Sequence, residues 1–400
     1  MQSELDAFFA NLANRADLLR EVSAQAFAKA RKRVSATAFE LLNDHFLALV
    51  DTQFGFPLWH GLRVVAGDAT VLRLTLFGKT RDGKPLVRHV IDAIGFALYL
   101  PGIEMTLAAT LYSPDVGERQ MLFEHLDKLR QNDLLVLDRG YPAYWLFAAL
   151  LQRGRQFCMR ADSLNFSAIQ AFRRSALTEQ IVTLPAPCKQ DALDYEIAAT
   201  PSEVRLIRQV FGHKVRVLVT SLLDLDAYPA AEFGALYHSR WRIEEAFKRI
   251  KHRLALEQLS GMSWLAARQD FGAKILCDNL NALAVHAASE SLDPNLRARY
   301  FINRGDTFSR LKRTLGRWLL RGLDALDNVT SVFNELIKNP ALCSSHPQRL
   351  TLSPAKILLF STNRSIVHGG EPRGYGPDQQ ARRTGWADRA SSEGNGSSGG

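Results

Sequence analysis

Residues 237–251 read YHSRWRIEEAFKRIK, and this stretch carries the most informative pattern in the chain. Tyr237, Arg240, Glu244 and Lys251 follow one another at steps of three, four and seven residues. A helix with 3.6 residues per turn places these four side chains on one face. We therefore predict one helix from about residue 230 to residue 256, with a single carboxylate flanked by two cations and a phenol. Such a face suits a metal ion bound beside a phosphate chain.

Two aspartates earlier in the chain each follow a short apolar run. Asp68 comes after residues 62–66 and Asp138 after residues 134–137, so both are predicted to end strands. The ends of adjacent strands meet at one edge of a sheet, where a packed helix can add Glu244. Three carboxylates form an oxygen site for Mg²⁺ or Mn²⁺. Two such ions about 3.5–4 Å apart activate a water or a 3′-hydroxyl and stabilise the leaving oxygen in phosphoryl transfer.

Each of these acidic residues also has a simpler interpretation. An aspartate that ends a strand is often a turn former, and a glutamate among arginines on a helix is often part of a solvated ion-pair network. Glu245 is a direct alternative to Glu244, because it is adjacent and chemically identical. The spacing of the four motif residues favours Glu244.

Composition restricts the class of protein without identifying it. The 400 residues have a net charge of +9 and 46% hydrophobic residues, which fits a globular chain with a polyanionic partner. Cys158, Cys188, Cys277 and Cys343 are widely spread and predict neither a zinc site nor a redox pair. The N-terminus lacks the features of a signal peptide, and the most apolar region, 90–111, is interrupted by charges and proline. We therefore expect a cytoplasmic protein with no membrane contact.

Periodicity and composition divide the chain into six regions. The first is helical and the second rich in strands; a β-rich insertion follows, and then the motif helix with a long apolar helix. A basic helical region and a disordered tail close the chain. Their predicted bounds are 1–55, 56–160, 161–226, 227–290, 291–345 and 346–400. The first region is a candidate for recognising DNA ends.

Taken together, these blocks resemble the DDE transposases of bacterial insertion sequences, of the insertion-sequence-four type with the Tyr-Arg-Glu-Lys motif. Residues 237–251 match Tyr-x2-Arg-x3-Glu-x6-Lys at every fixed position. Asp138-Arg139-Gly140-Tyr141 is similar to the family's second aspartate block, and Gly67-Asp68-Ala69-Thr70 to its first. The blocks occur in the family's order, and the resemblance covers about residues 25 to 330.

The resemblance implies an α/β fold: an RNase H-like mixed-sheet core, interrupted by the insertion and flanked by helices. It implies a catalytic, metal-binding triad of Asp68, Asp138 and Glu244, holding two Mg²⁺ or Mn²⁺ ions. Tyr237, Arg240 and Lys251 are expected to contact DNA phosphates, for which arginine and lysine are suited. Arg139 is a further candidate for DNA binding. A transposase of this kind cuts at the terminal inverted repeats and joins them to target DNA, as a nucleoid-associated homodimer on paired ends.

Two other functions stay open at this point. One is an RNase H-like nuclease that cleaves DNA without joining strands, and the other is an inactive, DNA-binding derivative of a transposase. The chain also departs from relatives that open DNA through a hairpin with a base stacked on a tryptophan, because no tryptophan lies between Trp145 and Trp241. Phe157, Phe166, Tyr195 and Phe211 are candidate substitutes for that stacking platform, with a place in the core as the alternative.

Overall fold

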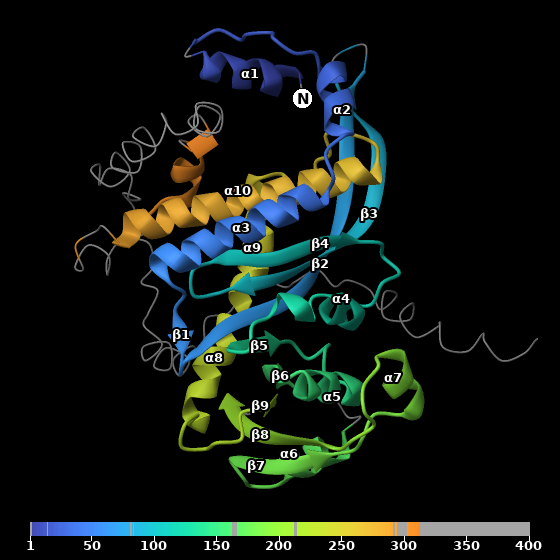
Figure 1. Ribbon diagram of the computed structural model, residues 1–400, viewed down its shortest axis with the longest axis vertical. Coiled ribbons are helices and arrows are strands. Elements are labelled where there is room, and N and C mark those ends of the chain that lie inside the picture. Colours follow the sequence, from blue (N-terminus) through green and yellow to red (C-terminus); the bar gives the residue numbers. More distant parts are fainter. Residues whose placement is uncertain are drawn as a thin grey trace, which may run out of the picture. The chain divides into compact units, whose positions relative to one another are not determined.

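The computed structural model describes residues 2–13, 15–80, 82, 84–161, 166–211, 214–290, 293, 302–309 and 311–312 (Figure 1). Most of the predicted basic region 291–345, and all of the predicted tail 346–400, lie outside these residues. In the described part of the chain, no helix is long and apolar enough to cross a lipid bilayer.

Helices and strands occur largely where the sequence predicts them. The helices are α1 (Gln2–Leu12), α2 (Ala24–Arg31), α3 (Thr37–Phe54), α4 (Glu118–Glu124), α5 (Tyr144–Gln152), α6 (Ser167–Arg174), α7 (Lys189–Asp194), α8 (Phe233–Ser239), α9 (Trp241–Arg253) and α10 (Trp264–Glu290), with 3₁₀ turns η1 (Leu126–Lys128) and η2 (Ala230–Glu232). The strands are β1 (Leu58–Trp59), β2 (Leu62–Lys79), β3 (Pro85–Leu100), β4 (Met105–Tyr112), β5 (Asp133–Leu137), β6 (Gln156–Arg160), β7 (Glu179–Leu184), β8 (Ser202–Phe211) and β9 (Lys214–Thr220).

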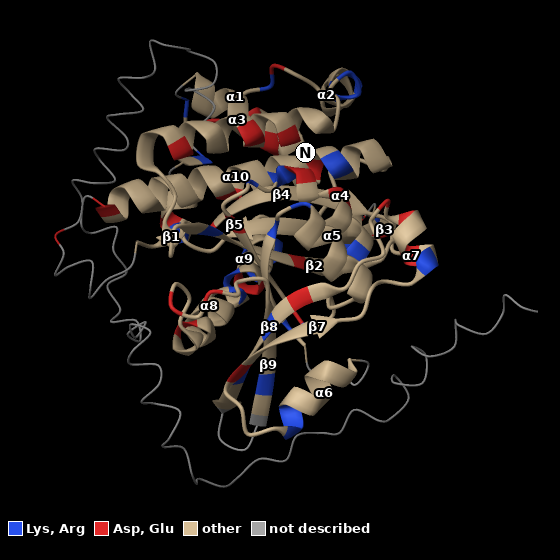
Figure 2. Ribbon diagram, turned by 60° about the horizontal axis from the view of Figure 1, so that its bottom comes forward, with Lys and Arg blue, Asp and Glu red and all other residues tan. Residues whose placement is uncertain are grey.

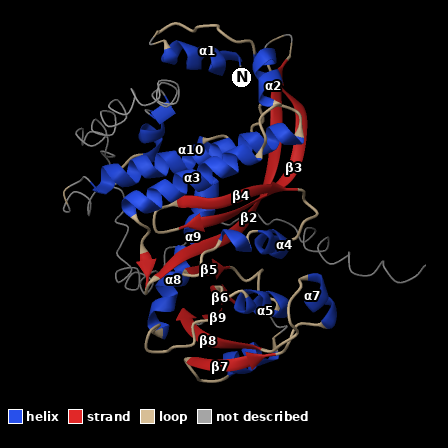
Figure 3. Cartoon of the chain, viewed as in Figure 1, coloured by secondary structure: helices blue, strands red, loops and turns tan. Residues whose placement is uncertain are grey.

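The strands form one mixed sheet in the order β4-β3-β2-β5-β6-β9-β8-β7, with the short β1 paired to β2. β2, β3 and β4 are antiparallel, whereas β5 pairs in parallel with both β2 and β6. This is the mixed α/β fold that the sequence predicts. The strands of the β-rich insertion, β7 to β9, extend the same sheet through the antiparallel pairing of β9 with β6 (Figure 3).

Helices cover both faces of the sheet, and the alternation of side chains along β2 shows which helices lie on which face. Val65 belongs to the large core cluster that includes residues of α4 and α5. Ala66 points the opposite way and packs against Ile243 and Phe247 of α9. Further along β2, Leu72 packs with residues from the end of α9 and from α10. α3 and α10 lie side by side and contact β4 (Figure 1).

The structure corrects the prediction that the strand beginning at residue 62 ends at Asp68. β2 is a single strand of 18 residues that runs through this point. The glycine serves close packing instead of a turn, because a Cβ at Gly67 would lie only 2.7 Å from Leu137 Cδ2 on β5. Because Gly67 has no side chain, β2 and Leu137 of β5 can pack closely next to Asp68.

The predicted single helix over residues 230–256 is also wrong, since it is divided into α8 and α9 at Arg240. The Arg240 N–H donates to Tyr237 O at 3.3 Å, and the Ile243 N–H donates to Arg240 O at 3.1 Å. These three-residue spacings tighten the backbone locally compared with the four-residue spacing of an α-helix. Tyr237 therefore lies on a different helix from Glu244 and Lys251.

Candidate active site

The pairing of β2 with β5 places Asp68 beside Asp138. Ala66 of β2 and Val136 of β5 are partners in the parallel register. Asp68 comes two positions after Ala66, and Asp138 comes two positions after Val136. Side chains two residues apart on a strand share a face, and neighbouring strands lie about 4.8 Å apart. Asp138 follows the end of β5, as predicted, but Asp68 lies within β2 and not at its end. The strand that ends beside Asp68 is the neighbouring β5.

Glu244 is brought to the same face by the packing of α9. Ile243, Ala246 and Phe247 contact small or flat residues of β2 and β3, among them Ala66. Arg249, further along α9, forms a double ion pair with the buried Asp278 of α10, with an Nη2–Oδ2 distance of 2.9 Å. Apolar packing and this ion pair together set the position of α9, and thereby that of Glu244.

Asp68 responds electrostatically to both of the other carboxylates. Its side chain is only 18% exposed, and burial raises its pKa to about 7. Arg240 and the backbone N–H of Ala69 act in the opposite direction, while the charges of Asp138 and Glu244 raise the pKa further. The three carboxylates predicted from the sequence therefore share one electrostatic site.

Arg240 bridges two of these carboxylates. Its Nη2 lies 2.7 Å from Glu244 Oε1, and its Nη1 lies 3.8 Å from Asp68 Oδ2. Arg240 is 6% exposed, and its buried Nε has no hydrogen-bond partner among the described residues. Glu245 points elsewhere: it pairs with Lys248 at 2.8 Å, and both side chains are largely exposed. The structure thus places Glu244, and not its neighbour, beside Asp68.

The other residues proposed to bind DNA have different surroundings. Tyr237 is 3% exposed, so burial raises its pKa, and the guanidinium groups of Arg216 and Arg240 lie over its ring. Lys251 donates from Nζ to the carbonyl oxygen of Val71 at 2.8 Å, at the edge of β2 that β5 no longer covers. Arg139 is exposed. Tyr237, Arg240 and Glu244 therefore each contact another motif residue, whereas Lys251 contacts the backbone of Val71.

The turn-forming interpretation of Asp138 also holds in part. Its Oδ1 accepts a hydrogen bond from the Gly140 N–H at 2.7 Å, which stabilises the loop after β5. One oxygen of Asp138 is thus engaged by the backbone. An aspartate can orient its own loop and still present its second oxygen to a ligand.

The carboxylates have the chemistry of a Mg²⁺ site, but they are not arranged as direct ligands of one ion. Within the described ranges, no three acidic, histidine or cysteine side chains gather closely enough to bind a metal together. The guanidinium of Arg240 lies between Asp68 and Glu244 and accounts for their separation. Arg240 offsets only part of the repulsion between the carboxylates. Their oxygen atoms are the ligands that a divalent cation prefers, and a cation can bind there once Arg240 moves away from Glu244.

The sequence analysis missed a buried ion pair that holds β2 and β5 in register. Arg63 donates to both oxygens of Asp133 at 2.6 and 2.7 Å, and the two side chains are 4% and 0% exposed. They are partners in the parallel register, each five positions before its aspartate, Asp68 or Asp138. The available signal was a charge at the start of each apolar run.

The candidate stacking residues of the insertion are used by the fold. Phe157 and Phe166 are buried in the core. Tyr195 stacks on Trp145 with ring centroids 3.7 Å apart and an interplanar angle of 3°. The side chain of Phe211 lies outside the described part of the structure. These three described residues therefore take the alternative role, as parts of the core or of a packed aromatic pair.

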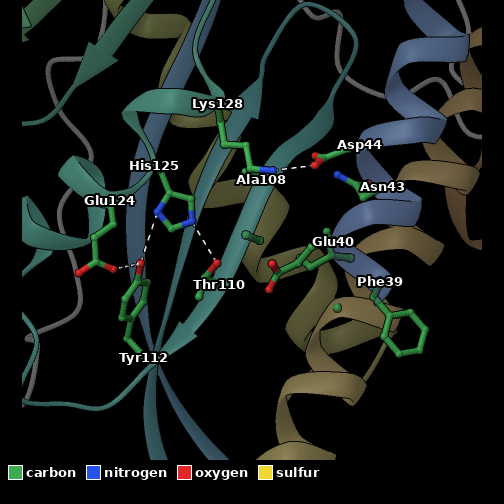
Figure 4. A pocket seen from close by; sticks show the side chains of 13 residues that line it. Phe39, Glu40, Asn43, Asp44, Ala108, Thr110, Tyr112, Glu124, His125 and Lys128 are labelled. Atoms are coloured by element: carbon green, nitrogen blue, oxygen red, sulfur yellow. Dashed lines mark hydrogen bonds and ion pairs between the residues drawn. The ribbon is translucent and has the colours of Figure 1, made fainter. Parts of the chain in front are cut away.

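A cavity of about 230 Å³ lies between α3, β4, α10 and the segment α4–η1 (Figure 4). His125 contacts Thr110 at 3.0 Å, Lys128 pairs with Asp44 at 2.6 Å, and the Tyr112 hydroxyl donates to Glu124 (Figure 4). No predicted site residue lines this cavity. The cavity is therefore separate from the acidic site.

Basic side chains in the described part of the chain are distributed over several elements (Figure 2). Arg173 and Arg174 end α6, and Arg216 lies on β9, at the end of the sheet formed by the insertion. Lys248 and Arg242 add charge to the exposed side of α9. Charge alone therefore does not single out one DNA-binding surface.

The raised pKa of Asp68 predicts how stability depends on pH without divalent cations. Its folded-state pKa of about 7 exceeds the ordinary value of 3.8 for an aspartate, so the folded state binds the proton more tightly than the unfolded state does. The free energy of unfolding should therefore fall as the pH rises through this window, with the full loss above pH 7. Asn cannot ionise, so Asp68→Asn should be more stable than the wild type at pH 8, by at most about 4 kcal/mol. Urea unfolding from pH 5.5 to 8.5 measures this, and an advantage that grows as the pH falls would contradict it.

Comparison with known proteins assigns the family. The family model for the transposase DDE domain matches residues 59–280, which contain all the predicted site residues. The chain belongs to the DDE transposase family. It is 24% identical over 253 residues to the transposase InsG for insertion sequence element IS4 of Escherichia coli (strain K12). That match covers 60% of this chain and 55% of the relative, so this DDE transposase chain matches about half the length of that protein.

A solved structure is also similar to this DDE transposase chain. It is the piggyBac transposase synaptic complex with hairpin DNA, with a TM-score of 0.40 and 12% sequence identity. The match covers 89% of this chain and 82% of the other.

Proposed function

We propose that this chain is a cut-and-paste DNA transposase, which cleaves DNA at the ends of an insertion sequence and joins them to target DNA. One observation carries the proposal: three acidic residues that are far apart in the chain come close together. The register of β2 and β5 sets Asp68 beside Asp138, and Arg240 connects Asp68 to Glu244 on α9. Their alignment with the order of the family's blocks supports the same conclusion. An Mg²⁺ or Mn²⁺ pair bound there supplies an activated oxygen nucleophile and stabilises the leaving oxygen.

The residues of the chain have distinct tasks in this proposal. Asp68 and Asp138 hold the cations from neighbouring strands, and Glu244 completes the ligand set from α9. Arg240 neutralises Glu244 until a cation does so, and then offers its planar fork to a DNA phosphate. Lys251 and the exposed Arg139 contact phosphates nearby, and Tyr237 supports Arg240 with its buried ring.

A strand-transfer assay distinguishes this function from that of a nuclease. The substrate is a plasmid carrying the genomic DNA from both sides of the coding sequence, where an insertion sequence keeps its ends. We expect Mg²⁺ or Mn²⁺ to promote cleavage at these ends and covalent joining to a second plasmid. Cleavage without joined product would favour the nuclease, and end binding without cleavage would favour an inactive derivative.

We propose further that the active form is a homodimer on paired ends, because joining two ends at one target requires two active sites close together. Sedimentation of the protein with and without a DNA fragment that carries the terminal inverted repeat tests this. A single protomer on each cleavage-competent fragment would contradict it.

A further inference from the structure

A fourth carboxylate, Glu118, lies close to Asp138 of the proposed site. Glu118 begins α4, on the loop side of β5. The next residue, Arg119, donates to the carbonyl oxygens of Tyr141 at 2.9 Å and Pro142 at 3.3 Å, and so ties the start of α4 to the loop that carries Asp138. Glu118 itself is exposed to solvent. Its carboxylate is therefore accessible to an ion while its helix is held in place.

Gly140 keeps the space between Glu118 and Asp138 open. A Cβ at this position would lie 3.1 Å from Asp138 Oδ1 and 3.7 Å from Glu118 Oε2. Any larger side chain would thus enter the gap between the two carboxylates. Its φ is not in the left-handed region, so the backbone conformation does not require glycine here. The close approach of the two acidic groups explains the residue better.

Tyr141 provides an independent observation that points to a ligand. Its side chain is 0% exposed, and its hydroxyl has no hydrogen-bond partner among the residues that the structure describes. Its backbone N–H donates to the carbonyl oxygen of Asp138 at 3.5 Å, so Tyr141 is held in the loop that carries this carboxylate. A buried hydroxyl without a partner destabilises a fold. The carboxylates near this hydroxyl are those of Glu118, Asp68 and Asp138, so a group bound among them can accept a hydrogen bond from it.

We propose that Glu118 is a fourth acidic residue of the metal site, binding a divalent cation through a coordinated water, with the Tyr141 hydroxyl as a hydrogen-bond donor to that shell. This inference rests on the proposed metal site of Asp68, Asp138 and Glu244. The structural alternative is that Glu118 only stabilises the start of α4, where a negative charge in the first turn is favourable. In that case its replacement changes thermal stability but not the affinity for a cation.

Mn²⁺ binding to the full chain without DNA tests the proposal, with free Mn²⁺ measured by electron paramagnetic resonance. Glu118→Gln should weaken Mn²⁺ binding about 10-fold, as the loss of an outer ligand does elsewhere. Glu245→Gln is the matched control, since it removes the same charge from an exposed ion pair, and it should bind Mn²⁺ as the wild type does. Tyr141→Phe should raise or preserve the melting temperature without cations but reduce the stabilisation that Mn²⁺ provides.

The variant Asp138→Asn distinguishes a failure of the role of Glu118 from a failure of the proposed metal site. If Asp138→Asn loses Mn²⁺ binding while Glu118→Gln binds as tightly as the wild type, the role of Glu118 is wrong and the proposed metal site stands. If Asp138→Asn binds Mn²⁺ normally, the proposed metal site itself is wrong. A fall in the melting temperature of Glu118→Gln with unchanged Mn²⁺ affinity would support the helix-start alternative and overturn the inference.

Discussion

Glu244→Gln is expected to slow metal-dependent cleavage and joining about 10³-fold, while the protein still binds transposon-end DNA. The change keeps the shape of the side chain but removes a charged ligand, and metal-ion stabilisation of several kcal/mol corresponds to rate losses of this size. It also replaces the charged partner of Arg240, 2.7 Å away, by a neutral amide oxygen, which binds the guanidinium more weakly. Arg240 then stays free to contact phosphate, so DNA affinity should not fall. Initial rates on labelled end DNA, together with a mobility-shift assay, measure both effects.

Glu245→Gln is the control for this experiment, because it makes the same change one position along α9. Glu245 pairs with Lys248 at the surface and has no contact with the acidic site. Its activity should stay within about twofold of the wild type, since exposed ion pairs contribute little. If Glu245→Gln loses activity and Glu244→Gln does not, the wrong glutamate has been assigned. Wild-type rates in both variants would show that neither glutamate of α9 takes part in catalysis.

Asp133→Asn is expected to reduce the free energy of unfolding by about 3–5 kcal/mol, because it leaves the charge of Arg63 buried without compensation. Asp133 is 0% exposed and accepts hydrogen bonds from Arg63 and from the Arg130 N–H. The pair lies in the register that sets Asp68 beside Asp138. Urea unfolding measures the loss of stability, and the cleavage rate reports any shift between the two strands.

Two further variants show whether the burial of this pair is the cause. Lys128→Met breaks the pair with Asp44, whose side chains are 42% and 39% exposed, and should cost less than about 1 kcal/mol. Replacing Arg63 with Met and Asp133 with Leu together should recover much of the loss, because no buried charge then lacks a partner. A loss below about 1 kcal/mol for Asp133→Asn would show that the pair does not hold the strands.

Local pattern was sufficient for most of the elements and for the identity of the acidic residues. The apolar run 134–137 located β5, and helical periodicity indicated the helical first region and the long apolar helix α10, because these signals depend on neighbouring residues only. The same reasoning failed at Gly67, where a glycine before an aspartate resembles a turn. Its actual role depends on Leu137, which is 70 positions away in the chain and adjacent in the sheet.

The four-residue motif shows the same limit on a helix. Spacing correctly put Arg240 and Glu244 within contact of each other, since they are one turn apart. It did not reveal the break at Arg240, the burial of Tyr237 or the bond from Lys251 to Val71. Each of these depends on what α8 and α9 pack against. The roles of all four residues in DNA contact and catalysis stay predictions.

By itself, the sequence determined the family, the mixed α/β class and a short list of acidic residues, because all three are written in residue types and in spacings along the chain. Only the tertiary structure decided that Asp68 lies inside a long strand, that Arg240 bridges two carboxylates, and that Glu118 and Tyr141 border the same site. These contacts arise from the pairing of β2 with β5 and from the packing of α4 and α9. Such contacts join residues distant in the chain, and no local period encodes them.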